Sequence, residues 1–185
     1  MRYPQNRKAE TRQKLIEKAG ALAKKEGFAT TGVDGLMASV GLTGGAFYSH
    51  FDSKSELLVE IINRELINSN NRIAGQRADA DISHVLNAYL SLLHVRFPEL
   101  GCVLPSLTNE VARSDDSVKE AFEKGLKTIH ASMTKHTDSE SSAWAILALS
   151  VGTISLARAL KTPELQQEFL TASAKFVIDT IEKAN

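Results

Sequence analysis

The sequence predicts an all-α protein of about nine helices, and two observations carry that prediction. Apolar residues recur every three or four positions along nearly all of the 185 residues, which gives each helix one apolar face. No stretch alternates strictly between apolar and polar residues, as a half-buried strand would. The composition, 43% apolar and 24% charged, is that of a globular protein and excludes disordered, collagen-like and low-complexity chains.

The amino-terminal 40 residues predict one long helix and one short helix. The long helix covers residues 7–26, ends at Gly27 and places five apolar residues on one face: Leu15, Ile16, Ala19, Leu22 and Ala23. Thr31, followed three residues later by Asp34, predicts the capped start of a short helix that reaches Val40.

A third short helix and a long fourth helix are predicted to follow. Gly41 allows a tight turn, and the third helix covers residues 44–50. Ser53 and Glu56 form a capping box, which predicts the start of a helix with one apolar stripe: Leu57, Leu58, Ile61, Ile62 and Leu66. A polar stretch near residues 68–81 is predicted to end that helix.

Five more helices are predicted from the same spacing. Their apolar stripes cover residues 82–93, 104–111, 118–133, 143–160 and 165–181. Pro98 is predicted to end the first of these helices, and the tract Ser114-Asp115-Asp116 to cap the third and add negative charge to its start. The fourth is apolar almost all round, but its 18 residues include Arg158 and three hydroxyl residues. A spanning helix needs about 20 apolar residues, so we expect burial against protein and no membrane partner.

Charge is divided unevenly along the chain, although the formal net charge is zero. Residues 1–54 carry nine basic and five acidic side chains, a net charge of +4. Residues 55–185 carry 13 basic and 17 acidic side chains, a net charge of −4. A basic amino-terminal part favours a polyanionic partner for that part alone. We therefore expect two domains, 1–53 and 54–185.

Residues 31–54 (TGVDGLMASVGLTGGAFYSHFDSK) have the layout of a helix-turn-helix. Four apolar residues are spaced to form a small core between the two short helices: Leu36, Val40, Leu42 and Phe47. The opposite face would present five residues to solvent: Thr43, Gly44, Gly45, Tyr48 and His50. Taken alone, the pattern also fits an ordinary helical hairpin whose polar residues face a bundle.

This region resembles the amino-terminal DNA-binding domain of the TetR family of transcriptional regulators. The resemblance covers about residues 7–60, and its most specific part is the tract GLTGGAFYSHF followed by Lys54 and Leu57. Gly27, Phe28, Thr31 and the stretch 33–37 also carry it. The resemblance implies a sequence-specific regulator that binds double-stranded DNA through a three-helix domain.

The resemblance also implies roles for individual residues. Four would contact phosphates and so fix the register of the protein on the duplex: Thr43, Tyr48, His50 and Lys54. Thr43 would in addition cap the recognition helix. The start of the second helix would lie against the DNA backbone at Thr31, with Asp34 or Gly35 near base edges.

The chain departs from the family at Gly44, where members often have Lys or Arg. Gly44 and Gly45 offer no long side chain for a bidentate contact with guanine. Backbone approach, DNA shape and a thymine-methyl contact by Ala46 would therefore contribute more. Glycine costs about 1 kcal/mol relative to alanine inside a helix, so we expect the recognition helix to order fully on DNA.

In the resembled family the second domain binds a small-molecule effector and forms a homodimer. The sequence agrees on the dimer independently, because the last two helices carry more apolar surface than one short bundle hides. We expect these helices to pair across a two-fold axis, which a palindromic DNA site would match. The alternative is that they are buried within the chain.

An effector cavity is predicted from aromatic and polar residues of the second domain: Tyr89, His94, Phe97, Cys102, Phe122, Met133 and Trp144. At helical spacing the same residues also fit a plain core. Cys102 follows Gly101 as in one subset of the family. Cys102 would sense electrophiles or oxidants if His94 or Arg96 stabilises its thiolate. Otherwise it would be an inert buried thiol.

We expect a cytoplasmic, ligand-responsive regulator, most simply a repressor that a small-molecule effector releases from a palindromic operator. One cysteine cannot form an internal disulfide, and no apolar segment follows the charged amino terminus, which fits a reducing compartment. Five histidines show no metal-ligand spacing, so neither metal nor cofactor is expected. We expect no enzymatic activity. Two alternatives are a hydrolase built on Cys102 and His94, without a visible oxyanion hole, and an architectural protein without an effector.

Overall fold

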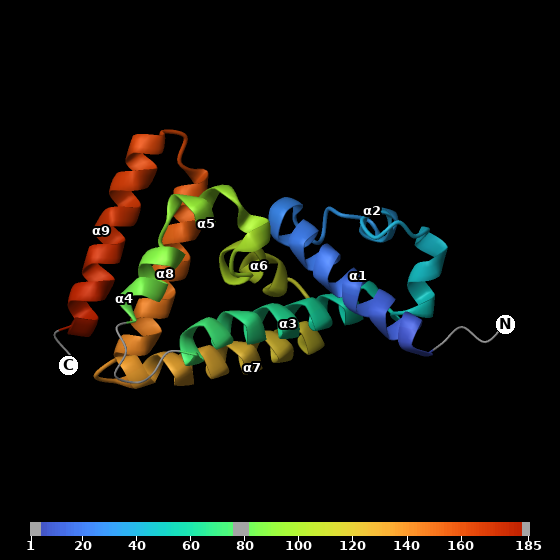
Figure 1. Ribbon diagram of the computed structural model, residues 1–185, viewed down its shortest axis with the longest axis horizontal. Helices are drawn as coiled ribbons and strands as arrows, with labels where there is room; N and C mark the ends of the chain where they lie inside the picture. Colours follow the sequence, from blue (N-terminus) through green and yellow to red (C-terminus); the bar gives the residue numbers. More distant parts are fainter. Residues whose placement is uncertain (1–4, 76–81, 183–185) are drawn as a thin grey trace.

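The protein is described by a computed structural model that covers residues 5–75 and 82–182, and every regular element in those ranges is a helix (Figure 1). The all-α prediction is confirmed, with nine α-helices and three short 3₁₀ helices in the described residues. The elements are α1 Gln5–Glu26, α2 Val33–Ala38, η1 Gly44–Ser49, α3 Lys54–Ala74, α4 Ser83–Tyr89, α5 Leu92–Arg96, η2 Pro98–Leu100, α6 Leu104–Val111, α7 Asp116–Met133, η3 Thr134–His136, α8 Glu140–Ala159 and α9 Pro163–Glu182.

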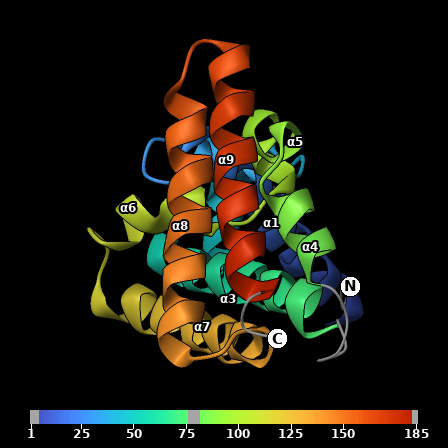
Figure 2. The same ribbon diagram turned by 90° about the vertical axis from the view of Figure 1, so that its left-hand side faces the viewer.

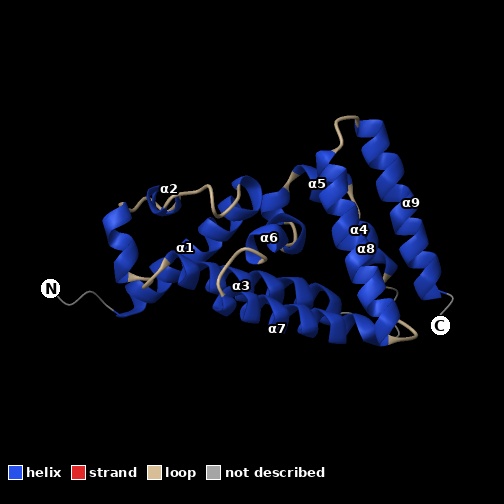
Figure 3. Cartoon of the chain, turned by 180° about the vertical axis from the view of Figure 1, so that it is seen from behind, coloured by secondary structure: helices blue, strands red, loops and turns tan. Residues whose placement is uncertain are grey.

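The helices form an amino-terminal head and a larger body that share one long helix. The head consists of α1, α2, η1 and the first turns of α3, at the end of the molecule opposite α9 (Figure 1). Helix α3 then runs beside α7 into the body. Because α3 belongs to both parts, any tilt of α3 relative to the body moves the head. Seen from behind, loops make up only a small share of the described chain (Figure 3).

Helices α8 and α9 stand side by side at the far end of the body (Figure 2). By length and composition, α8 could cross a membrane, with a mean hydropathy of 1.4 over its most apolar 18 residues. In this fold it packs against α5, α6, α7 and α9, although only 39% of that window is buried. Part of this apolar helix is therefore covered within the described chain, and part of its apolar surface faces outward.

Two expected boundaries differ from the structure. The single helix expected over residues 82–97 is two helices, α4 and α5. The Ser91 hydroxyl interrupts it by donating to the Ala88 carbonyl at 2.8 Å and accepting from the His94 amide at 3.4 Å. Helix α3 continues through Ala74, into the polar stretch expected to end it; residues 76–81 of that stretch lie outside the described residues. Two of the predicted caps are present, with Ser53 accepting from the Glu56 amide and Asp115 from the Val118 amide.

Candidate functional site

The head is organised around a small apolar core that holds η1 in place. Leu36 and Met37 of α2, Phe47 of η1 and Phe51 are all fully or almost fully buried. Gly41, with φ of +75°, makes the sharp turn between α2 and η1 that a residue with a Cβ rarely adopts. The turn is closed by the Leu42 amide, which donates to the Met37 carbonyl at 3.0 Å. Sequence reasoning thus located the helix-turn-helix and two buried residues of its core, Leu36 and Phe47. The predicted core residues Val40 and Leu42 are only half-buried, and the buried Met37 was missed.

The recognition segment is a 3₁₀ helix rather than the α-helix expected over residues 44–50. Its i+3 hydrogen bonds include Ala46 amide to Thr43 carbonyl at 3.0 Å and His50 amide to Phe47 carbonyl at 2.9 Å. Two glycines at its start weaken the α-helical alternative. The Tyr48 ring is 69% exposed, so it is free to meet a partner. Thr43 occupies the N-cap position, but its side chain makes no capping hydrogen bond, which corrects that part of the prediction.

Two further residues of the predicted DNA face, Asp34 and Gly35, lie in the first turn of α2, and Thr31 precedes that helix. The expected capping role of Thr31 is wrong, because its hydroxyl donates to the Gly27 carbonyl at 2.8 Å and the N-cap of α2 is Gly32. Gly35 and the carboxylate-bearing Asp34 are exposed on the first turn of α2.

The lack of a side chain at position 44 has a steric explanation. A Cβ at Gly44 would lie 1.8 Å from Oδ1 of Asp34 and 3.0 Å from its Cγ. A long basic residue would therefore require Asp34 to move. At Gly45, by contrast, a Cβ would meet nothing within 4 Å. The chain thus presents the Asp34 carboxylate over Gly44, and Ala46 of the same segment is half-buried.

His50 and Lys54 lie at the edge of this face and are both half-buried. Burial, followed by the positive charges of Lys8 and Arg12, lowers the pKa of His50, so its ring is neutral at neutral pH. The Nδ1 atom of His50 has no hydrogen-bond partner among the described residues. Lys54 Nζ donates to the Ala29 carbonyl at 3.3 Å. Burial lowers the pKa of Lys54, opposed in part by Glu110.

The body contains a cavity of about 640 Å³ between α3, α4, α5, α6, α7 and α8. Five of the residues predicted for an effector cavity line it: Tyr89, His94, Phe97, Cys102 and Met133. Two others lie outside the lining. Phe122 packs half-buried against the core, and Trp144 stacks on His130 with a ring-centre distance of 4.0 Å. The sequence analysis missed Arg72 and Ser150, because helical spacing does not separate a core position from a cavity wall.

Hydrogen bonds fix His94 as a neutral imidazole in the cavity wall. Its Nδ1 lies 2.8 Å from the Tyr89 carbonyl and must donate, so its Nε2 accepts the Cys102 amide at 3.0 Å. Burial above all lowers the pKa of His94 to about 4. A Cβ at Gly101 would lie 2.2 Å from His94 Cδ2, so glycine allows this contact. Neither ring nitrogen is free to take a proton from a nucleophile.

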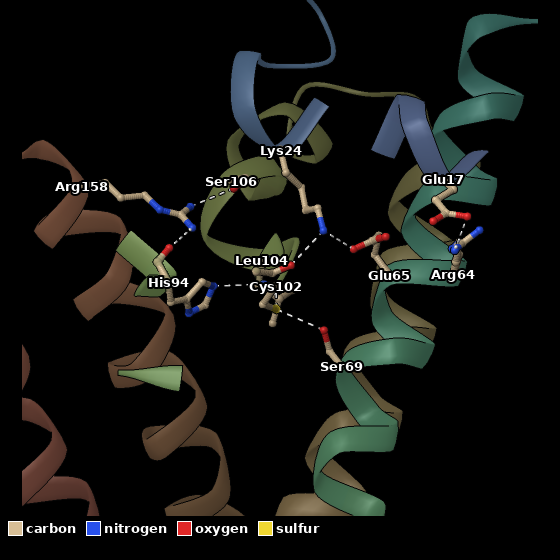
Figure 4. Close-up of polar contacts among 11 residues, drawn as sticks. Glu17, Lys24, Arg64, Glu65, Ser69, His94, Cys102, Leu104, Ser106 and Arg158 are labelled. Atoms are coloured by element: carbon tan, nitrogen blue, oxygen red, sulfur yellow. Dashed lines mark hydrogen bonds and ion pairs between the residues drawn. The ribbon is translucent and has the colours of Figure 1, made fainter. Parts of the chain in front are cut away.

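Cys102 is buried, and its thiol has only weak partners among the described residues. The Ser69 hydroxyl donates to its Sγ at 3.4 Å, and the Leu104 amide at 3.5 Å (Figure 4). Neither cation named from the sequence serves this thiol, because His94 is neutral and Arg96 is exposed outside the cavity lining. The cation that interacts electrostatically with Cys102 is instead Arg158 of α8. With both nitrogens of His94 engaged, the geometry gives no support to a Cys–His hydrolase.

A chain of polar contacts connects the cavity wall to the head (Figure 4). Lys24 of α1 donates to Glu65 Oε2 of α3 at 2.6 Å and to the Gly101 carbonyl at 2.9 Å. On the other side of the wall, Arg158 of α8 donates to the His94 carbonyl at 3.0 Å and to Ser106 Oγ at 2.9 Å. The segment around Gly101 and Cys102 is thus held between α1 and α8.

Comparison with known proteins is consistent with this architecture. Residues 15–61 match the family described as bacterial regulatory proteins, tetR family. The reduced form of NemR from E. coli is 22% identical over 92% of this chain and 96% of NemR, with a TM-score of 0.74. A TetR transcriptional regulator from Chloroflexus aurantiacus is 22% identical over 93% and 96%, with a TM-score of 0.75. A Saccharomonospora viridis protein solved with choline is 15% identical over 91% and 96%, with a TM-score of 0.68. A search of proteins of curated function finds no match.

Proposed function

We propose that this chain, a DNA-binding transcriptional regulator of the tetR family, is a repressor that binds a palindromic operator as a homodimer and is released by a small-molecule effector. One observation carries the proposal: a rigid apolar core holds an exposed recognition segment, Gly44–Ser49, at one end of a helix that reaches the cavity. Neither a catalytic role nor a cofactor is part of the proposal. A cytoplasmic location follows from the DNA partner.

Phosphate and base contacts divide between the edge and the centre of the head. Phosphates would be contacted by four residues: Thr43, Tyr48, His50 and Lys54. Thr31 would lie near the DNA backbone. Asp34, seated over Gly44, would accept from a cytosine amino group in the major groove, while Gly35, Gly45 and Ala46 allow close approach. The missing basic side chain at position 44 is thereby replaced by an acceptor.

The salt dependence of DNA binding tests these roles. Lys54→Ala should weaken binding to every duplex and reduce the slope of log affinity against log salt by about one. His50→Ala should also weaken binding, but at pH 8 it should leave the slope unchanged because the ring is neutral. Lys124→Ala, an exposed lysine on α7, is the matched control. If Lys54→Ala kept the affinity and changed the preferred sequence, the phosphate role would be wrong.

The outer face of α8 and α9 supports the homodimer. Leu156, Leu165 and Phe176 are each between 46% and 66% exposed, although these two helices also contribute buried residues to the body. Pairing two copies of α8 and α9 would cover these side chains in a four-helix interface. We expect sedimentation to find a dimer and Phe176→Asp to shift it to monomer. An unchanged dimer in the variant would contradict this interface.

Effector release requires that the cavity and the head are coupled. Movement of the segment around Gly101 on ligand binding would break its contact with Lys24 and change the angle of α1. An effector acts only if it binds the two arrangements with different affinities. Selection of duplexes from a random pool, repeated with candidate effectors, tests the whole proposal. A chain that selects no sequence would refute it, and selection without any effector response would favour the architectural alternative.

A further inference from the structure

The composition of the cavity wall restricts the charge of its ligand. Most lining residues are apolar, and no Asp or Glu is among the lining residues that the structure describes. Arg72 belongs to the lining, and Arg158 and Lys24 lie behind it. Glu65 compensates the charge of Lys24, whereas Arg158 donates to a hydroxyl and a carbonyl, which are neutral. A cationic ligand would meet no carboxylate among the described lining residues.

Two buried hydroxyl groups in the wall lack a strong hydrogen-bond partner. Ser150 of α8 is 5% exposed and its Oγ has no partner among the described residues. The Tyr89 hydroxyl is buried with only the Cys102 thiol, a weak hydrogen-bonding group, beside it. Burial raises the pKa of Tyr89, so the phenol keeps its proton and can donate. Buried polar atoms are usually paired, so these hydroxyls point to a ligand oxygen that accepts from them.

The opening of the cavity is apolar as well. Leu93 and Leu100 line the cavity and are about 70% exposed, and Phe97 between them is 44% exposed. Large apolar side chains at a solvent-facing rim are unfavourable unless a ligand or partner covers them. They favour a ligand whose body is a hydrocarbon.

We propose that the cavity binds an amphipathic carboxylate, with its hydrocarbon body against Leu93, Phe97 and Leu100 and its carboxylate accepting from Tyr89 and Ser150. This inference rests on the effector role proposed above and names the class of effector. A volume of about 640 Å³ accommodates a chain or ring system of moderate size. The carboxylate would be favoured by the positive charge of Arg158, whose hydrogen bonds are to neutral oxygens.

Three probes of equal length separate the contribution of the head group from that of the hydrocarbon: octanoate, 1-octanol and octylamine. Titration calorimetry on the full chain should give an affinity for octanoate at least about tenfold above that for 1-octanol, with octylamine weakest. If octylamine binds as tightly as octanoate, or none of the three binds, the proposal is overturned.

Two variants test the assigned donors. Tyr89→Phe and Ser150→Ala should each weaken octanoate binding about five- to thirtyfold, because each removes one hydrogen bond to a charged acceptor. Their effect on 1-octanol should be smaller. Trp144→Phe, outside the cavity, should change neither affinity. Octanoate binding that survives both donor variants would overturn the assignment of the carboxylate to this wall.

Operator binding measured in parallel separates this inference from the proposed function. If octanoate binds as described but leaves the operator bound, the ligand class stands and the effector role fails. If an uncharged or cationic compound releases the operator and octanoate does not bind, the regulator stands and the ligand class is overturned.

Discussion

The two ends of α1 are joined to α3 by the same kind of ion pair in different surroundings. At the end near the body, the Lys24 and Glu65 side chains are 5% and 12% exposed and Lys24 also holds the Gly101 carbonyl. At the outer end, Arg12 pairs with Glu56 and Glu60, and all three side chains are about a third exposed. Water can replace the outer contacts but not the inner one. The proposed coupling between cavity and head should therefore depend mainly on the inner pair.

The largest effect expected from this comparison is at the inner end. Lys24→Met leaves the Glu65 carboxylate buried without its cation, which should reduce the free energy of unfolding by about 3–5 kcal/mol in urea denaturation. Adding Glu65→Met should recover most of the loss, because two apolar side chains then replace the pair. A loss below about 1 kcal/mol in the single variant would mean that water enters the site.

The inner network should also make stability depend on pH. His94 has a pKa of about 4 in the folded chain against 6.5 when unfolded, so below pH 6.5 only the unfolded chain takes up the proton. Stability from this group is complete above pH 6.5 and is lost as pH falls toward 4. At about 1.4 kcal/mol per pH unit, the loss is about 3 kcal/mol. Urea denaturation across this range should show it.

The control for that pH dependence is His94→Gln, which cannot titrate. The difference in unfolding free energy between the two proteins isolates His94 from other groups whose pKa is lowered, such as His136. Parallel pH profiles for the two proteins would contradict the buried, neutral state of His94.

The sequence predicted features that have a local pattern and missed contacts between residues far apart in the chain. The core of the head was predictable because Leu36, Phe47 and their neighbours follow helical spacing around a glycine turn. The hydrogen-bond partners of the Thr31 and Ser91 hydroxyls were not predictable, because a hydroxyl can either cap a helix or donate to a nearby carbonyl. The local sequence does not decide between these two partners. The bond from Lys24 to the Gly101 carbonyl joins residues 77 positions apart and leaves no local pattern.

Cavity residues show the same limit in the body. Tyr89, Cys102 and Met133 were predicted from their chemistry and line the cavity, whereas Trp144 was predicted on the same grounds and stacks on the surface instead. Aromatic character reveals which residues could line a cavity, but packing between distant helices decides which of them do.

At the outer end the expected effect is smaller and depends on salt. Arg12→Ala removes two partly exposed ion pairs, a 3.4 Å contact with the His50 carbonyl and stacking on Phe51, and should cost about 1 kcal/mol. Urea denaturation in 50 mM and 1 M NaCl should show this difference shrinking at high salt, while that of Lys24→Met persists. A salt-independent loss for Arg12→Ala would remove the contrast between the two ends.

The smallest expected effect concerns the recognition segment, Gly44–Ser49, and tests whether it is only loosely ordered before the protein binds DNA. Gly45→Ala adds a methyl group where nothing lies within 4 Å, so it should stabilise the fold by about 0.5 kcal/mol through the unfolded chain and favour a helical recognition segment. Gly44→Ala is the matched comparison, because its Cβ would lie 1.8 Å from Asp34 Oδ1 and offset the same gain by displacing that side chain. Thermal unfolding measures both changes in stability, and operator affinity shows their consequence for DNA binding.

If the recognition segment orders on DNA, Gly45→Ala should tighten binding by pre-forming the segment. Gly44→Ala should instead alter the sequence preference at the base pair that faces Asp34. Equal effects of the two substitutions on stability and on sequence preference would mean that Asp34 does not define this surface.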